Sequence, residues 1–448
     1  RTQLAALDTT TLSALDETQM GALNATQIKA LTATQISGLT AEDVAEMTTT
    51  QIANLAATQV QALTSTNMAS MADTQVAAFT TSQVKAFSAS TIAAFTDTQI
   101  AALTTTQVSA LGATQIAGLT ETNVAAMTNT QIGAITATQI ASLTATAVSG
   151  FDSAQFASLS TTQVKALTTT QMSALNATDI SDFTNTQIAA LTTTQITGLT
   201  TTNVGDLTET QIGALSTAQV QSLSASSISS MSDTQIAAFA NTQIAALASN
   251  QVQGLNATNI GALTTTQIGA LTSTQIALLS TTNVRAMADT QVAAMSTTQV
   301  RAFTASQITA LRTTDLGEFT ETQIGALLDT QVQALSTTNF AALADTQVAA
   351  LTTTQLAAVS TAQVTALTET QVGAMTTNQV QALSTTQLRA LTATNLSALD
   401  ASQMSALTAT QIAGLTTTQI ASLEATDIAE LATTQIAALT TAQVKGLT

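Results

Sequence analysis

Residues 32–39 read Thr-Ala-Thr-Gln-Ile-Ser-Gly-Leu, and residues 40–47 read Thr-Ala-Glu-Asp-Val-Ala-Glu-Met. The same eight-residue pattern continues in one register through all 448 residues, a length that equals 56 octads. Short tandem repeats usually stack, because each unit can bury its apolar side only against its neighbours. Length alone suggests about three domains, but the unbroken period predicts a single continuous solenoid over residues 1–448.

Two polar positions of the octad predict where helices begin. With the octad lettered a to h from Thr32 to Leu39, position a is usually Thr, Ser, Asp or Asn, and position d is usually Gln. In the capping box Thr-x-x-Gln, the hydroxyl accepts a hydrogen bond from the third helical amide, and the Gln side chain accepts one from the amide of the cap. The apolar residues at h and e form the accompanying hydrophobic staple. The pattern therefore predicts a helix start in every octad.

The predicted helices are short. At about 100° per residue, e, g and h face the core, while b and f, which carry most of the charged side chains, face water. A continuous helix would rotate its apolar side by about 80° in every octad. We therefore expect helices of about five to six residues, which are too short to persist without packing against neighbouring octads. The predicted fold class is an all-α solenoid with one helix per octad.

A β-solenoid is the alternative fold. Thr, Ile and Val favour strands, and Gln and Thr can form side-chain ladders. Strict alternation would place the apolar residues at h on the same face as the charged residues at b and f. This mismatch favours the helical solenoid.

A second, longer period of 136 residues, or 17 octads, runs through the chain. It indicates duplication of a 17-octad block, and a whole number of superhelical turns is one structural interpretation that the sequence does not require. The residues that recur with this period include Lys29, Lys165 and Arg301 at f, Asp43, Asp179 and Asp315 at d, and Asn67, Asn203 and Asn339 at d.

Four octads with Asp at d also carry an acid at g, three residues later. Two carboxylates at this spacing lie side by side on a helix and could bind Ca²⁺ together with carbonyl groups and water. The alternative is that Asp replaces Gln as the capping partner and that the second acid is solvated. The candidate Ca²⁺ ligands are Asp43 with Glu46, Asp179 with Asp182, Asp315 with Glu318, and Asp427 with Glu430.

Thr at both a and c resembles the Thr rows of ice-binding proteins. On a helix, a and c point about 200° apart, so we do not expect them to form one flat row. Helix capping by a is the favoured interpretation.

The composition excludes several classes of site. The net charge of −17 argues against binding to nucleic acid and to anionic membranes. The chain has no Cys and no His, so it can form neither a disulfide nor a zinc site of its own. No apolar stretch is long enough for a membrane span. Because the chain begins at Arg1 rather than Met, we expect a processed chain or the ordered part of a longer one.

Residues 191–199 read Leu-Thr-Thr-Thr-Gln-Ile-Thr-Gly-Leu. This sequence resembles the Thr-Thr-Gln-Ile-x-Ala-Leu octapeptide arrays of very large bacterial surface proteins, which are often labelled as adhesins or haem-utilisation proteins. The resemblance implies a secreted or surface-displayed bacterial array, and no functional residue carries over from it. The chain has no His, Cys or Tyr to ligate haem iron.

No catalytic triad or phosphate-binding loop is present, so we expect neither an enzyme nor a bound cofactor. The leading hypothesis is a structural protein that forms an extracellular fibre, filament or stalk. The alternative is an adhesin or a module that binds ice or glycans. The expected partners are further copies of the chain, associated end to end or laterally, or a longer chain of the same repeats.

Overall fold

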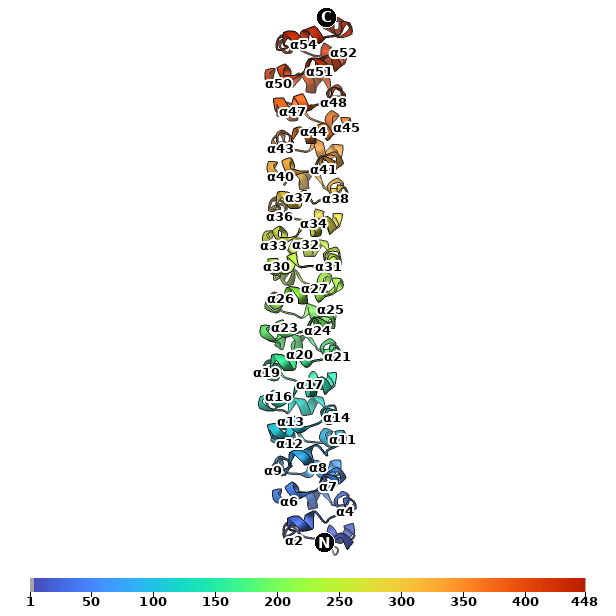
Figure 1. Cartoon of the computed structure of the whole chain (residues 1–448), viewed down its shortest axis with the longest axis vertical. Helices are drawn as coiled ribbons and strands as arrows, with labels where there is room; N and C mark the ends of the chain where they lie inside the picture. Colours follow the sequence, from blue (N-terminus) through green and yellow to red (C-terminus); the bar gives the residue numbers. More distant parts are fainter. Residues whose placement is uncertain (1–3, 448) are drawn as a thin grey trace. The chain divides into compact units, whose positions relative to one another are not determined.

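The computed structural model describes residues 4–447, and within this range every regular element is helical. A short 3-10 helix, η1 (Leu4–Ala6), precedes 55 α-helices, from α1 (Thr9–Leu12) to α55 (Thr441–Gly446). One helix follows another along a winding path in Figure 1. The predicted α-solenoid is confirmed, and the β-solenoid alternative is wrong for the described residues.

Every α-helix begins at position b, so that helix αn begins at residue 8n + 1. Six helices have four residues and end at e, namely α1, α3, α10, α14, α18 and α37. Nineteen have five residues and end at f: α2, α4, α5, α9, α11, α15, α24, α25, α29, α30, α35, α36, α39, α42, α45, α46, α49, α52 and α53. The remaining helices have six residues and end at g.

The capping box forms as the sequence predicts. In α4 (Ala33–Ser37), the Thr32 hydroxyl accepts from the Gln35 amide at 3.2 Å, and Gln35 Oε1 accepts from the Thr32 amide at 2.8 Å. Where Ala56 replaces the capping Thr, the amide of Ala56 still donates to Gln59 Oε1 at 2.7 Å. No described residue has a positive φ, so the chain passes from one helix to the next without left-handed backbone.

The core consists of the residues at e and h. Ile36 is 0% exposed and Leu39 is 5% exposed, and the same pattern recurs along the chain. Positions b and f face solvent, as predicted, but position g is half-buried rather than buried. Its small residues lie against position b three octads earlier, and a Cβ added to Gly150 would lie 2.5 Å from the carbonyl oxygen of Glu121.

Each turn of the solenoid contains between three and four octads, which the sequence could not reveal. Helices three octads apart pack together, such as α4 with α7 (Ala57–Ala62). Hydrogen bonds between turns join residues that are 25 to 31 positions apart. A helix in one turn therefore contacts the turn that precedes it by about three and a half octads.

The chain divides into two compact units, which we call unit 1 (Arg1–Ser230) and unit 2 (Met231–Thr448). Both are built from the same octads, and the helical pattern is the same in each. The single continuous solenoid over residues 1–448 stays a prediction, and it includes residues 1–3 and 448, which lie outside the described residues.

Candidate functional site

The first members of the four predicted acidic pairs are buried in the role that Gln has elsewhere. Asp43 and Asp179 are each 4% exposed, and they accept hydrogen bonds from the capping amides of Thr40 at 2.7 Å and Asn176 at 3.0 Å. Asp315 accepts from the amide of its capping residue at 2.7 Å, and Asp427 does so at 2.9 Å. All four therefore replace Gln as the capping partner.

The second members lie half-buried at the surface of the same octads. Asp182 accepts a hydrogen bond from the Ser153 hydroxyl of the preceding turn at 2.9 Å. Burial raises the pKa of Glu46, and the carboxylate of Glu17, also from the preceding turn, raises that pKa further. Burial likewise raises the pKa of Asp179, the capping bond from Asn176 opposes this shift, and nearby acids add to it. Carboxylates of successive turns thus lie close enough to disfavour one another's charge.

Only one of the four buried acids has a cationic side chain beside it among the described residues. Arg312, at the capping position, forms an ion pair with Asp315 at 2.7 Å and also donates to the carbonyl oxygen of Arg285 at 2.8 Å. The guanidinium thereby joins a buried carboxylate to the backbone of the turn before it.

Within residues 4–447, no group of three or more acidic side chains is arranged to hold a metal ion. Each predicted pair supplies two carboxylates, one of which is already held by a capping amide. Binding of Ca²⁺ at these pairs stays a prediction.

The glutamine at d has a second function that the sequence analysis missed. Its Oε1 completes the capping box, while its Nε2 donates to carbonyl groups of the preceding turn. Gln51 Nε2 lies 2.7 Å from the carbonyl oxygen of Met20 and 2.9 Å from that of Leu23, and Gln51 is 3% exposed. The signal was the near-invariance of Gln, because a capping partner alone could equally be Glu.

Almost every other Gln at d in the described turns makes the same pair of bonds, at e and h of the turn before. Gln131, Gln195 and Gln363 are examples from both units. An amide is required here, because only a neutral amide can accept from one backbone group and donate to another. This tie between turns is the dominant polar feature of the molecule.

The threonine hydroxyls at a and c lie closer together than a continuous helix allows. The Oγ1 atoms of Thr264 and Thr266 are 3.0 Å apart, as are those of Thr352 and Thr354. The angular argument was wrong at this point, because residue a is the cap and lies outside the helix.

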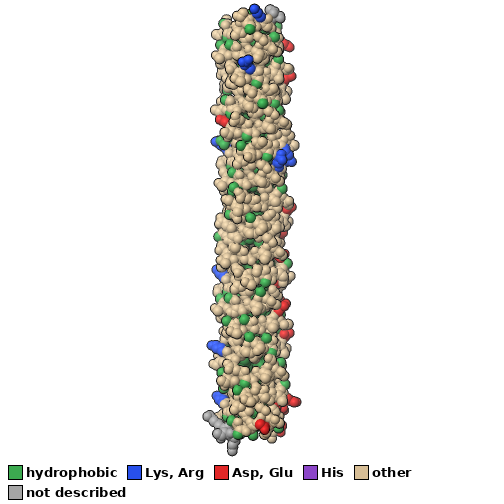
Figure 2. All heavy atoms as spheres, turned by 90° about the vertical axis from the view of Figure 1, so that its right-hand side faces the viewer, with side chains coloured by type: hydrophobic (Ala, Val, Ile, Leu, Met, Phe, Trp, Pro, Cys, Tyr) green, Lys and Arg blue, Asp and Glu red, His purple; other side chains and the backbone are tan. Residues whose placement is uncertain are grey.

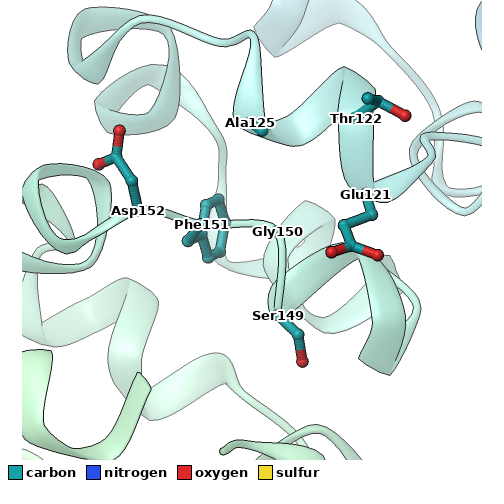
Figure 3. A pocket seen from close by; sticks show the side chains of 7 residues that line it. All are labelled: Glu121, Thr122, Ala125, Ser149, Gly150, Phe151 and Asp152. Carbon is teal, nitrogen blue, oxygen red and sulfur yellow. The ribbon is translucent and has the colours of Figure 1, made fainter. Parts of the chain in front are cut away.

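The surface of unit 1 has a shallow hollow of about 350 Å³ beside α15 (Glu121–Ala125) and the segment that follows α18 (Ala145–Val148). Glu121 and Asp152 lie at opposite ends of this hollow, with Gly150 and Phe151 between them (Figure 3). The two carboxylates do not converge on a common point, so this geometry offers no paired acid and base.

Four segments of the chain are similar to the ALTTAQ repeat family: residues 76–113, 244–281, 348–385 and 380–417. Each match begins at an e position, so all four share the register of the octads. No curated protein matches the chain in sequence. The similarity supports a repeat protein made of short helices, and it extends to both units.

The helices of residues 4–447 are all too short to cross a lipid bilayer.

Proposed function

We propose that this chain is a structural repeat protein, a stalk or filament element whose task is mechanical. The observation that carries this proposal is the glutamine tie, which joins each octad to the preceding turn by two hydrogen bonds buried from water. Hydrogen bonds in a water-excluded setting are costly to break, because each buried group then lacks a partner. An array of identical ties distributes load over many turns, and the length of the element follows from the number of octads.

An extracellular location on a bacterial surface is part of the proposal. It is supported by the absence of Cys, the acidic composition and the resemblance to octapeptide arrays of large surface proteins. The match to the ALTTAQ repeat agrees with an array, although it does not specify where the array is displayed.

We further propose end-to-end self-association. In the last described turns, Ile436 is 42% exposed and Val444 is 51% exposed, whereas e residues of inner turns are almost fully buried. In the first turns, the side chains of Gln19 and Gln27 make only their capping bonds among the described residues. The amides of one copy can therefore tie to the carbonyl groups of another, which would also cover the exposed apolar residues.

Pulling on the full chain through handles at its two ends tests the mechanical role. We expect the chain to resist force and to unfold in a series of small steps, because each repeat contacts only its neighbours. Tight and specific binding of a glycan or adsorption to ice, together with unfolding at negligible force, would overturn the proposal in favour of the adhesin alternative. Sedimentation of the wild type against Val444→Glu tests self-association separately.

A further inference from the structure

The glutamine tie is interrupted at regular intervals in unit 1. Position d has no side-chain amide in five octads past the first turn, at Asp43, Thr91, Ala147, Asp179 and Ser227. It carries the shorter amide of Asn in three others, at Asn67, Asn123 and Asn203. With Thr11 in the first turn, successive interruptions are 24 or 32 residues apart, and the eight intervals from Thr11 to Ser227 average 27 residues.

This spacing follows the turn of the solenoid, because neighbouring turns touch at separations of 25 to 31 residues. The interrupted octads therefore stack on one side of unit 1. Contacts confirm the stacking: α5 packs on α8, α8 on α11, α15 on α18, and α22 on α25. The hydrogen bond from Asn123 Nδ2 to the carbonyl oxygen of Phe95, at 3.1 Å, joins α15 to the end of the α11 octad.

We call these nine helices the seam helices. They are α1 (Thr9–Leu12), α5 (Ala41–Ala45), α8 (Ser65–Ser70), α11 (Ala89–Ala93), α15 (Glu121–Ala125), α18 (Ala145–Val148), α22 (Ala177–Asp182), α25 (Thr201–Gly205) and α28 (Ala225–Ser230).

The seam helices are tied to the preceding turn more weakly than their neighbours. A Gln at d makes two bonds to that turn, as Gln59 does with Ile28 and Leu31. Asn67 makes one, to the carbonyl oxygen of Leu39. The hydroxyl of Thr91 bonds to its own capping residue instead, and Ala147 has no polar side chain to offer.

Negative charge gathers on the same side. All 14 acidic residues of unit 1 lie in a seam octad or in the octad directly after one. The three lysines, Lys29, Lys85 and Lys165, each lie two octads after a seam helix. Figure 2 shows acidic side chains of unit 1 gathered along one edge and basic ones along the opposite edge.

The carboxylates on this side act on one another across turns. Glu17 and Asp16 of one turn raise the pKa of Glu46 in the next, after burial, which is the larger cause. Coulomb repulsion between like charges at these separations favours a larger distance between the turns that carry them.

We propose that this side of unit 1 is a seam, at which successive turns separate first and whose opening is driven by the stacked carboxylates. The opposite side keeps its glutamine ties and carries the lysines, so it stays closed and acts as the hinge. Unit 1 therefore bends in one preferred direction, with the seam on the outer, stretched side. This inference concerns the mechanics of the turn stack and does not depend on the proposed function.

The 136-residue period acquires a physical meaning from the seam. Five turns of about 27 residues span 136 residues, so a block of 17 octads returns the same residue to the same side. Asp43 and Asp179 are seam residues one block apart, and Lys29 and Lys165 keep the same relation on the opposite side.

Hydrogen–deuterium exchange on the full chain tests the proposal, because short helices exchange when their packing opens. We expect the seam helices to exchange about tenfold faster than the other helices of unit 1, the change that corresponds to losing one or two net hydrogen bonds. Raising NaCl from about 10 mM to about 1 M shortens the screening length from about 30 Å to about 3 Å and should slow exchange at the seam only.

Three variants make the test specific. Ala147→Gln and Thr91→Gln restore the tie, and each should slow exchange of its own helix about tenfold. Gln83→Ser, on the lysine side, removes a tie and should raise exchange of α10 (Thr81–Val84) to the rate of the seam. Uniform exchange along unit 1, insensitivity to NaCl, or no effect of either restored Gln would overturn the proposal.

Discussion

Unit 1 and unit 2 are built from the same octad, but they differ in how the interrupted positions are bonded. In unit 1, five octads past the first turn have no side-chain amide at d, whereas in unit 2 only Asp315 and Asp427 lack one. Four Asn residues of unit 2 keep one bond each, for example Asn283 to the carbonyl oxygen of Leu255 at 2.8 Å. Arg312 supplies a cation beside Asp315 and a bond to the preceding turn.

The comparison shows that a uniform backbone does not require uniform cohesion. Burial of e and h is nearly identical in the two units, so the apolar core does not distinguish them. The difference lies in a few polar side chains, each of which adds or removes a bond between turns. We therefore expect unit 2 to open less readily than unit 1, and the predictions below test or reverse that order.

The largest effect is expected from a change of register. Inserting one Ala after Leu143 in unit 1 separates the staple, the cap and every inter-turn tie that spans the insertion, since these ties join residues 28 and 31 positions apart. Several bonds and contacts are lost at once, so we expect local destabilisation of several kcal/mol. Helices near the insertion should exchange as unfolded chain. The same insertion after Leu343 in unit 2 is the matched control, and tolerance of either insertion would contradict the register model.

Removal of Arg312 should make unit 2 resemble unit 1. In Arg312→Ala, the buried carboxylate of Asp315 loses its ion pair, and the carbonyl oxygen of Arg285 loses a donor. Because the guanidinium is 54% exposed, we expect only about 1 kcal/mol. Exchange of α39 (Thr313–Gly317) measures the change. A double variant, Arg312→Ala with Asp315→Asn, should recover most of the loss, because it leaves no buried charge.

The helical octads could be predicted from the sequence because the signal is local. The cap at Thr32 and its partner Gln35 lie three residues apart, so the helix start is encoded within a single octad. The number of octads per turn could not be predicted, because it depends on the angle between octads, which no short-range pattern specifies.

The acidic pairs show the same boundary between local and non-local information. That Asp43 replaces Gln as a capping partner follows from its position, and the alternative stated from the sequence was the one the structure shows. That Glu46 lies near Glu17 requires knowing that residues 29 positions apart share a face. The tie from Gln51 to Met20 spans 31 positions and was missed for the same reason.

A smaller effect is expected from single caps, and it should differ between the units. In α18 of unit 1, Thr144 is the only side chain in the cap, because Ala147 occupies d and cannot return a bond. In α44 (Thr353–Ala358) of unit 2, the Gln355 side chain still accepts from the amide of Thr352. We expect Thr144→Ala to cost about 1–2 kcal/mol and Thr352→Ala about 0.5–1 kcal/mol. Equal losses in exchange-derived stability would show that the two halves of the capping box act independently.

The smallest effect is expected from titration of Asp179 in unit 1. Burial raises its pKa, the capping bond from Asn176 lowers it, and Asp182 and Glu121 raise it again, with a net rise. A carboxyl whose folded pKa exceeds its unfolded value destabilises the fold when ionised, and this penalty disappears as pH falls through the folded pKa to the unfolded one. The stability of the wild type relative to Asp179→Asn should therefore improve between about pH 7 and about pH 4. Exchange of α22 measures this difference, and Asp329→Asn, which removes one charge from unit 2, controls for net charge. A relative stability that falls on acidification would mean that the carboxylate is stabilised by its capping bond more than it is destabilised by burial, and the seam would then lose one of its driving charges.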